Sequence, residues 1–192
     1  MKKTLIGISV LIIFIFFVFS VFYFETPLSI IRPVFHKQII NYYCKLYKMD
    51  PLFVTAIIKE ESKFLRRAHS HMGAIGLMQL MPKTARELAL ELGYTNFSEK
   101  DLESPNVNIN LGMYYLYKLD KLFRGDKVQI LASYNAGIGN VQNWQLKNKN
   151  GSLKIEDIPY KETRIYIQNV LRTYQWLKET QKIKKLIREK IA

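Results

Sequence analysis

Two adjacent glutamates, Glu60 and Glu61, are the first candidates for chemistry in this chain, because the stretch around them otherwise has the pattern of a buried helix. With Ile57 placed at 0° on a helical wheel, Glu61 falls at about +40° and Glu60 at about −60°. Both glutamates therefore border an apolar stripe that includes Phe53 and Phe64. A carboxylate in such a place loses hydration, which raises its pKa and lets it keep a proton at neutral pH. That is the property a general acid needs.

An ordinary structural role is the alternative for these two residues. One glutamate could cap the helix, or form an ion pair with Arg66 or Arg67 at the edge of the stripe. The wheel favours Glu61 over Glu60 only slightly, because Glu61 lies between two apolar positions. Spacing alone therefore does not decide between the pair.

Neither a metal nor an organic cofactor is expected. His69 and His71 come nearest to a metal-ligand pattern, but they have no further ligands at helical spacing. The chain also shows no phosphate-binding loop and no serine–histidine–aspartate arrangement.

Helical periodicity places these residues in a mainly α protein. Asp50 followed by Pro51 is typical of a helix start, so a helix is predicted from Pro51 to about Leu65. No segment shows the alternation of a strand. The other predicted helices are a segment from about residue 39 to 47, Pro82–Leu92, Asn108–Phe123, Lys127–Ala136 and a long helix from Tyr160 onward.

The N-terminal part of the chain has the pattern of a membrane span. Thr4–Phe24 contains no charged residue, and at about 1.5 Å per residue it makes a helix of about 31 Å, enough for a hydrocarbon core of about 30 Å. A cleaved signal peptide is the alternative, but the apolar run is longer than its usual core. We therefore expect a membrane anchor over 1–24, a connector over 25–37, a catalytic domain over 38–177 and a basic amphipathic helix end over 178–192.

The net charge of +13 suits an acidic partner such as nucleic acid, anionic lipid or an acidic wall polymer. Nucleic acid is not expected, because the aromatic residues are not interleaved with the basic ones in a recognisable binding module. The end of the chain, from Lys178 onward, is either a solvated helix end or a contact with the wall or membrane surface.

Ordered blocks of sequence carry a resemblance to a known family. They are ESKF from Glu61, then AHS, GAIGLMQLMPKTA, NINLGMYYL, ASYNAGIGNV and IPYKETRIYIQNV. Together they resemble the catalytic domain of lytic transglycosylases of the soluble, goose-type-lysozyme-like kind, from Pro51 to Val170. The resemblance implies a lysozyme-like helical domain and assigns the catalytic acid to Glu61, the glutamate that precedes serine.

The resemblance also implies a set of substrate-binding residues along a groove. In the family's groove segment the tyrosine hydroxyl reaches toward the catalytic glutamate, although Tyr134 could equally pack its ring between helices. Leu77, Met78 and Met81 could form an apolar floor under sugar rings, or belong to the core. The residues implied as substrate-binding are Ser70, Gln79, Met81, Tyr134, Asn135, Ala136 and Glu162.

The activity implied is cleavage of the β-1,4 bond between N-acetylmuramic acid and N-acetylglucosamine in peptidoglycan. Glu61 would act first as acid and then as base, which leaves 1,6-anhydro ends without using water. Alternatives are a hydrolytic muramidase on the same fold and an inactive wall-binding module. The expected protein is a monomer, held in the cell membrane by its N-terminal helix, with the catalytic domain outside the cytoplasm and peptidoglycan strands as its partner.

Overall fold

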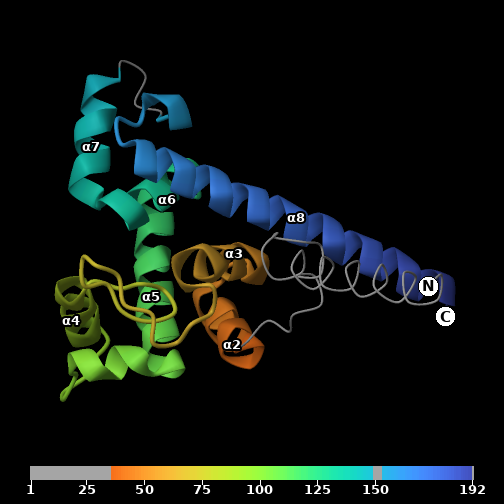
Figure 1. The fold of residues 1–192 in the computed structure, drawn as a ribbon, viewed down its shortest axis with the longest axis horizontal. Coiled ribbons are helices and arrows are strands. Elements are labelled where there is room, and N and C mark those ends of the chain that lie inside the picture. The colour runs from red at the N-terminus through yellow and green to blue at the C-terminus, as the bar shows by residue number, and fades with distance from the viewer. Residues whose placement is uncertain (1–35, 149–152, 192) are drawn as a thin grey trace, which may run out of the picture. The chain divides into compact units, whose positions relative to one another are not determined.

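The predicted helical domain is present in the computed structural model, which describes residues 36–148 and 153–191 (Figure 1). Among these residues the structure contains helices and isolated β-bridges that join His69 to Ile75 and Ile75 to Leu80. The elements in chain order are α2 (Lys37–Tyr47), α3 (Pro51–Ser62), α4 (Pro82–Glu91), η2 (Glu99–Glu103), α5 (Pro105–Phe123), α6 (Lys127–Ala136), α7 (Ile138–Lys147), η3 (Ile155–Asp157) and α8 (Lys161–Ile191).

The helix that carries the two glutamates begins where the sequence predicts. The Asp50 side chain accepts a hydrogen bond from the Leu52 N–H at 2.8 Å, and Pro51 occupies the first turn of α3. The predicted end at Leu65 is wrong: α3 ends at Ser62, because Lys63 and Phe64 take φ values of 50° and 66°. These left-handed residues stop the helix directly after Glu61 and turn the chain into a loop.

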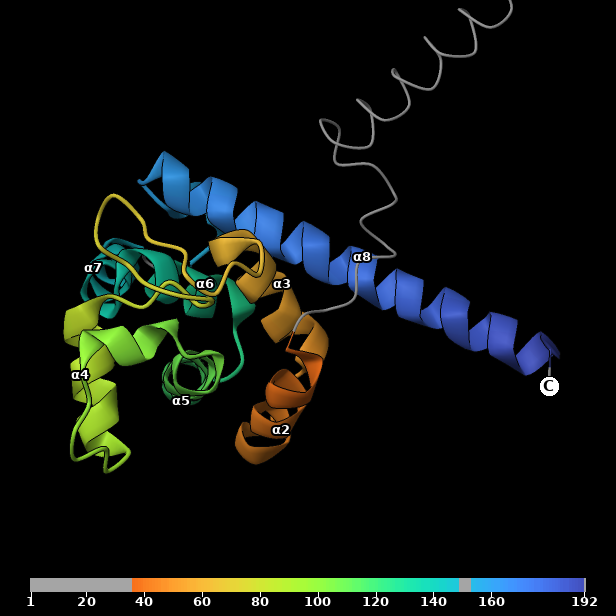
Figure 2. The same cartoon turned by 60° about the horizontal axis from the view of Figure 1, so that its bottom comes forward.

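Helix α5 lies between α4 and α2, as the end-on view of Figure 2 shows. Its inward side chains are almost completely buried, among them Ile109, Met113, Leu116 and Leu119. It starts at Pro105, about one turn before the predicted Asn108, because Ser104 and Pro105 already supply the extended residue and the N-terminal proline of a helix start. The core is therefore built around one central helix.

Helix α8 packs along α3 in the opposite chain direction. Near one end, the Tyr174 hydroxyl donates to Asp50 Oδ2 at 2.6 Å, and its ring meets Phe53 edge-on at 5.5 Å. Near the other end, Asn169 Nδ2 donates to Glu60 Oε1 at 2.6 Å. This pairing brings the C-terminal helix alongside both glutamates.

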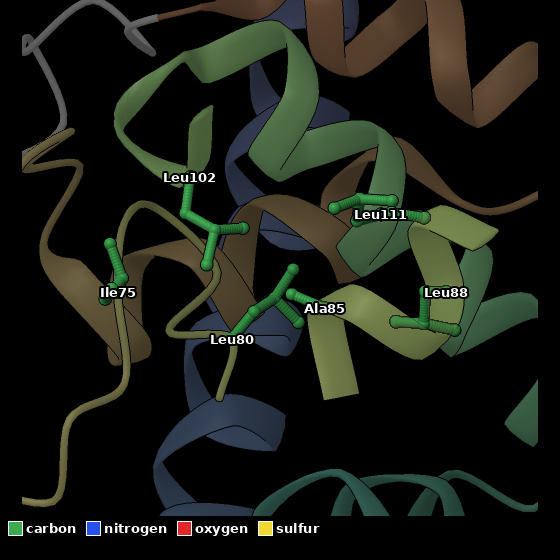
Figure 3. Packing of buried hydrophobic residues seen from close by; sticks show 7 residues of the cluster. Ile75, Leu80, Ala85, Leu88, Leu102 and Leu111 are labelled. Carbon is green, nitrogen blue, oxygen red and sulfur yellow. The ribbon is translucent and has the colours of Figure 1, made fainter. Parts of the chain in front are cut away.

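The loop between α3 and α4 is fastened to the core by its own apolar side chains. Ile75 and Leu80 of this loop belong to one buried cluster with Ala85 and Leu88 of α4, Leu102 of η2 and Leu111 of α5, which Figure 3 shows from close by. All of them are buried. The loop therefore has a defined conformation at the end of α3.

The predicted anchor, Thr4–Phe24, lies outside the residues that the structure describes. The same holds for the predicted connector, 25–37, as far as Phe35. Within residues 36–148 and 153–191, we find no helix that combines the length and apolar character of a membrane span. The predicted basic segment from Lys178 onward continues α8 without a break.

Candidate active site

Glu61 has the electrostatics of a proton donor at neutral pH. It lies in the last turn of α3, partly buried between α8 and the loop that follows α3. The pKa of Glu61 is raised to about 7: burial raises it most, the Tyr166 hydroxyl lowers it, and the charge of the neighbouring Glu60 makes a smaller contribution that raises it. A carboxyl group with this pKa can both give and take a proton near neutral pH.

Tyr166 of α8 is the group that faces this carboxyl, and sequence reasoning missed it. Its hydroxyl is buried and makes no regular hydrogen bond in the described part of the chain. It nevertheless lies close enough to Glu61 for the two groups to shift each other's pKa: burial first, and then the Glu61 charge, raise the pKa of Tyr166 well above its usual value. A buried polar atom without a regular partner is rare and calls for an explanation.

Glu60 is oriented differently from Glu61. Its carboxylate accepts the 2.6 Å hydrogen bond from Asn169 described above, which holds it against α8. The Arg67 Nε lies 3.0 Å from Glu103 Oε2, so the ion pair that the structure shows for this arginine is with Glu103. The two adjacent carboxyl groups therefore have different neighbours: Glu60 is bonded to Asn169, whereas Glu61 faces Tyr166.

Tyr134, at the end of α6, has the packing role that its sequence left open, and its hydroxyl bonds to a backbone group. Its ring packs against Tyr115 with centroids 5.4 Å apart, which is the packing role. Its hydroxyl donates to the Met78 carbonyl at 2.7 Å rather than to the Glu61 carboxyl. The Glu61 charge still contributes, after burial, to raising the pKa of Tyr134, so the phenol lies within electrostatic reach of the glutamate.

The loop after α3 is held beside Glu61 by polar side chains that bond to backbone groups. Ser62 Oγ donates to the Leu77 carbonyl at 2.8 Å. Asn108, which is buried, accepts from the Met78 N–H at 2.8 Å and donates to the carbonyls of Ile75 and Leu102 at 2.9 and 3.0 Å. One side chain of α5 thus binds three backbone groups, two in the loop after α3 and one in η2.

Gly76 makes this close approach possible. Its φ is +83°, and a Cβ there would lie 2.2 Å from Asn108 Nδ2 and 2.4 Å from the Leu102 carbonyl oxygen. Both the left-handed backbone and the lack of space require glycine at this position.

Two of the predicted substrate-binding residues help to shape the same loop. Ser70 Oγ accepts from the Ala74 N–H at 2.9 Å and so closes a tight turn. Gln79, with φ of 45°, donates through Nε2 to the carbonyls of Gly76 and Ala68 at 2.8 and 3.1 Å. Both donor hydrogens of the Gln79 amide are therefore used within the loop.

The three apolar residues considered as a floor for sugar rings separate into two kinds. Leu77 and Met78 are buried, and Met78 packs so closely on Gly112 that a Cβ there would lie 2.4 Å from its Sδ. Of the two alternatives that the sequence left open, these two residues take the core position, because the loop folds them inward. Met81 is 43% exposed at the start of α4 and remains available for contact.

The remaining predicted residues lie on α6 and α8. Asn135 is exposed and Ala136 is partly buried at the end of α6, next to Gly137, which ends the helix with φ of 90°. Glu162 is exposed in the first turn of α8. Among the described residues no group of three or more histidine, cysteine, aspartate or glutamate side chains could hold a metal ion.

Comparisons with known proteins show the family to which this domain belongs. The family model described as "Transglycosylase SLT domain" matches residues 38–156. The soluble lytic murein transglycosylase of Escherichia coli K12 is 33% identical over 144 residues, which cover 72% of this chain and 22% of that protein. The membrane-bound lytic murein transglycosylase E of Buchnera aphidicola is 35% identical over 142 residues, covering 69% of this chain and 67% of the relative.

A solved structure is similar in both fold and sequence. The X-ray structure of an inactive glutamate-to-glutamine mutant of the lytic transglycosylase Slt from Pseudomonas aeruginosa superimposes with a TM-score of 0.71 at 39% identity. The match covers 79% of this chain and 25% of that one, so the present chain spans only about a quarter of the larger Slt proteins. The family match over residues 38–156 and the similar lysozyme-like helical fold together place this chain in the SLT transglycosylase domain family.

Proposed function

We propose that this chain is a peptidoglycan lytic transglycosylase that uses Glu61 as its only catalytic carboxyl group. The observation that carries the proposal is the pKa of about 7 at Glu61, in a family-matched domain, beside the buried Tyr166 hydroxyl. The inactive glutamate-to-glutamine mutant of the P. aeruginosa relative supports the dependence of this chemistry on a glutamate.

In the first step the protonated Glu61 gives its proton to the oxygen that bridges N-acetylmuramic acid and N-acetylglucosamine, as the bond from that oxygen to the muramic acid C1 breaks. At neutral pH a group with a pKa of about 7 is protonated in a large fraction of molecules, whereas an ordinary glutamate is almost entirely ionised. The N-acetyl group of the substrate stabilises the positive charge that develops at C1.

In the second step the Glu61 carboxylate takes the proton from the muramic acid C6 hydroxyl while that oxygen attacks C1. The product carries a 1,6-anhydro ring, no water is consumed, and Glu61 regains its proton. The Tyr166 hydroxyl has the right place to donate to the carboxylate between the two steps, which gives its buried oxygen a partner in the ionised state.

The arrangement of the carboxylates favours this mechanism over hydrolysis. Most glycosidases use two carboxyl groups about 5–9.5 Å apart on opposite sides of the bond that they cleave. Glu60 is a poor second carboxylate, because consecutive residues of a helix diverge by about 100° and because Asn169 already holds it against α8. An attacking C6 hydroxyl has an effective concentration of up to about 10⁵ M or more in well-oriented systems, which bulk water cannot match.

We assign substrate contacts to the residues around Glu61. Gln79 would use its Oε1 as an acceptor, since its Nε2 is spent on backbone carbonyls. Exposed Met81 offers an apolar surface to a sugar ring, and exposed Asn135 and Glu162 offer polar groups. Ser70, Ala136 and Tyr134 shape the backbone around the bound strand, with Tyr134 acting through the Met78 carbonyl.

We also propose that Thr4–Phe24 holds the protein in the cell membrane as a single span, with a monomeric catalytic domain on the outer side. The length of the apolar run supports this, and both soluble and membrane-bound transglycosylases occur among the relatives. Protease added to intact cells stripped of their wall should degrade the domain. Protection until the membrane is broken would contradict the topology, and a mature chain that begins near Val21 would contradict the anchor.

The products of digestion test the activity. Purified peptidoglycan treated with the protein should release muramic ends that are lighter by one water in mass spectrometry and resistant to borohydride reduction. Glu61→Gln should release none. Reducible muramic ends would assign the chain to hydrolytic muramidases, and binding without any release would assign it to wall-binding modules.

A further inference from the structure

The last part of α8 has no contact with the rest of the described domain that would bury it. Every residue from Gln181 to Lys190 is exposed, and both views show this end of the helix projecting beyond α2 and α3 (Figures 1 and 2). Its ion pairs join residues of the same helix, Lys182 with Glu179 at 2.9 Å and Lys185 with Glu189 at 3.8 Å. A projecting helix of this kind is stable only marginally by itself in water.

The exposed segment is strongly amphipathic. Ile183, Leu186 and Ile187 are 56%, 58% and 51% exposed, and Trp176 stands in line with them about two turns earlier. We call these four residues the outer stripe. Six basic and two acidic residues occupy Lys178–Lys190, which leaves the segment with a charge of +4.

The outer stripe does not extend the face by which α8 packs on its own domain. Ile167, Val170 and Tyr174 form that inner face and are buried. At about 100° per residue, Ile183 lies about 180° away from Tyr174 around the helix axis and about 160° away from Ile167. The described domain cannot cover the outer stripe without rotating the helix, so this surface is available to something outside residues 36–148 and 153–191.

We propose that the C-terminal half of α8 lies on an anionic lipid surface, with the outer stripe inserted at the level of the headgroups and the flanking lysines and arginine facing lipid phosphates. Aliphatic residues and one tryptophan on one side, with basic residues on the other, are the composition of interfacial helices. A wall polymer would use the basic residues but gives the aliphatic stripe no apolar surroundings. A second copy of the helix would cover the stripe but would bring two +4 segments together.

The membrane anchor proposed above would keep the end of α8 close to the lipid surface, and this step rests on that proposal. A connector over residues 25–37 spans at most about 45 Å when fully extended, and α8 is about 46 Å long, so the projecting end stays within range of the membrane that holds the chain. Tethering of this kind produces effective concentrations in the millimolar range, on the order of those of short flexible linkers. A modest intrinsic affinity for lipid is therefore enough to set the orientation of the domain relative to the membrane.

Trp176 is a natural probe for the test. The chain has two tryptophans, and the other, Trp144, is buried. The full chain is reconstituted from detergent into vesicles of phosphatidylcholine alone, or with an equal part of phosphatidylglycerol, with and without brominated acyl chains. We expect brominated lipid to quench the chain's fluorescence only in the vesicles with phosphatidylglycerol, and the quenching to disappear in Trp176→Phe.

Surface variants separate the contribution of the aliphatic side chains to lipid binding from that of the basic side chains. Ile183→Ser combined with Ile187→Ser should abolish the quenching, whereas Leu46→Ser combined with Leu90→Ser, which removes comparable exposed aliphatic surface from α2 and α4, should leave it unchanged. Lys184→Gln combined with Lys185→Gln should lower the ratio of bound to free helix on the order of 30-fold, at about five-fold for each basic residue near an anionic surface.

Several outcomes would overturn the inference. If the chain stays bound to the phosphatidylglycerol vesicles but the fluorescence of Trp176 is not quenched, the inference is wrong. It is also wrong if the variant with both Ile183→Ser and Ile187→Ser is quenched as strongly as the original protein. A fluorescence response to purified wall sacculi but not to vesicles assigns the segment to the wall. A doubled mass in detergent that depends on the outer stripe, without a lipid response, assigns it to a second copy. Loss of the whole chain from phosphatidylcholine vesicles, in contrast, refutes only the anchor.

Discussion

Replacing Glu61 by glutamine should make the protein more stable at alkaline pH while it removes activity. The folded state holds the pKa of Glu61 at about 7 instead of its ordinary 4.5, so the unfolded chain releases this proton first as the pH rises. Stability is therefore unaffected below about pH 4.5, falls between about pH 4.5 and 7, and stays lowered above that range. At about 1.4 kcal/mol for each pKa unit, the ionised Glu61 costs the folded state at most about 3 kcal/mol. Glutamine has a similar shape but does not ionise, so it avoids this cost.

Urea unfolding of the two proteins at several pH values between 4 and 8.5 measures the effect. The difference in unfolding free energy, variant minus original, should be near zero at pH 4 and reach about 3 kcal/mol in favour of Glu61→Gln at pH 8.5. Glu162→Gln is the matched control, because this exposed glutamate gains nothing from burial and a surface substitution changes stability by only about 0.5 kcal/mol. A difference that does not vary with pH, or a variant that is less stable at pH 8.5, would refute the view that burial sets the pKa of Glu61.

Two further substitutions test the neighbours of the Glu61 carboxyl group, and a pair of glycine substitutions tests the packing of the loop after α3. Tyr166→Phe removes the hydroxyl that lowers the pKa of Glu61, so the alkaline limb of the pH–rate profile should move to higher pH, and turnover should fall by about 10- to 100-fold. Glu60→Gln removes a nearby negative charge and should move the same limb to lower pH with most activity kept; an unmoved limb would mean that the charge of Glu60 is not felt at Glu61. Gly76→Ala should lower the unfolding free energy by more than about 2 kcal/mol, whereas Gly93→Ala, with φ of +77° and open space around it, should lose only about 1 kcal/mol. Equal losses in thermal unfolding at the two glycines would show that the contacts of residue 76 are unimportant.

The starts of the helices were readable from the sequence because their signals are local. Asp50 with Pro51, Pro82, and Asp126 before Lys127 are each followed by a helix where expected. The end of α3 was not readable, since Lys63 and Phe64 have no special tendency for left-handed backbone and adopt it because the following loop is fastened to the core. Helix α7 was missed because Gly137 reads as a stop, whereas in the structure it joins two helices.

The candidate site also has features that the sequence predicts and features that it does not. The helical wheel placed Glu61 at the border of an apolar stripe, and the ordered sequence blocks singled it out from Glu60, both without a structure. The burial of Leu77 and Met78 could not be predicted from the sequence. A methionine or leucine beside a glycine-rich turn is equally suited to a core and to a binding surface. The hydrogen bond from the Tyr134 hydroxyl to the Met78 carbonyl was not predictable either, because the acceptor lies on a loop far away in the sequence.

By itself, then, the sequence determined where most of the helices begin and that two glutamates border the apolar stripe of one of them, because helix periodicity and capping act between residues a few positions apart. Only the tertiary structure decided that burial raises the pKa of Glu61 to about 7, because a pKa depends on the water and charge around the carboxyl group in space. Those surroundings come from α8, whose Asn169 bonds to Glu60 across 109 positions of sequence and whose Tyr166 hydroxyl faces Glu61. No local pattern encodes such a meeting, since it results from the packing of two helices that are far apart in the chain.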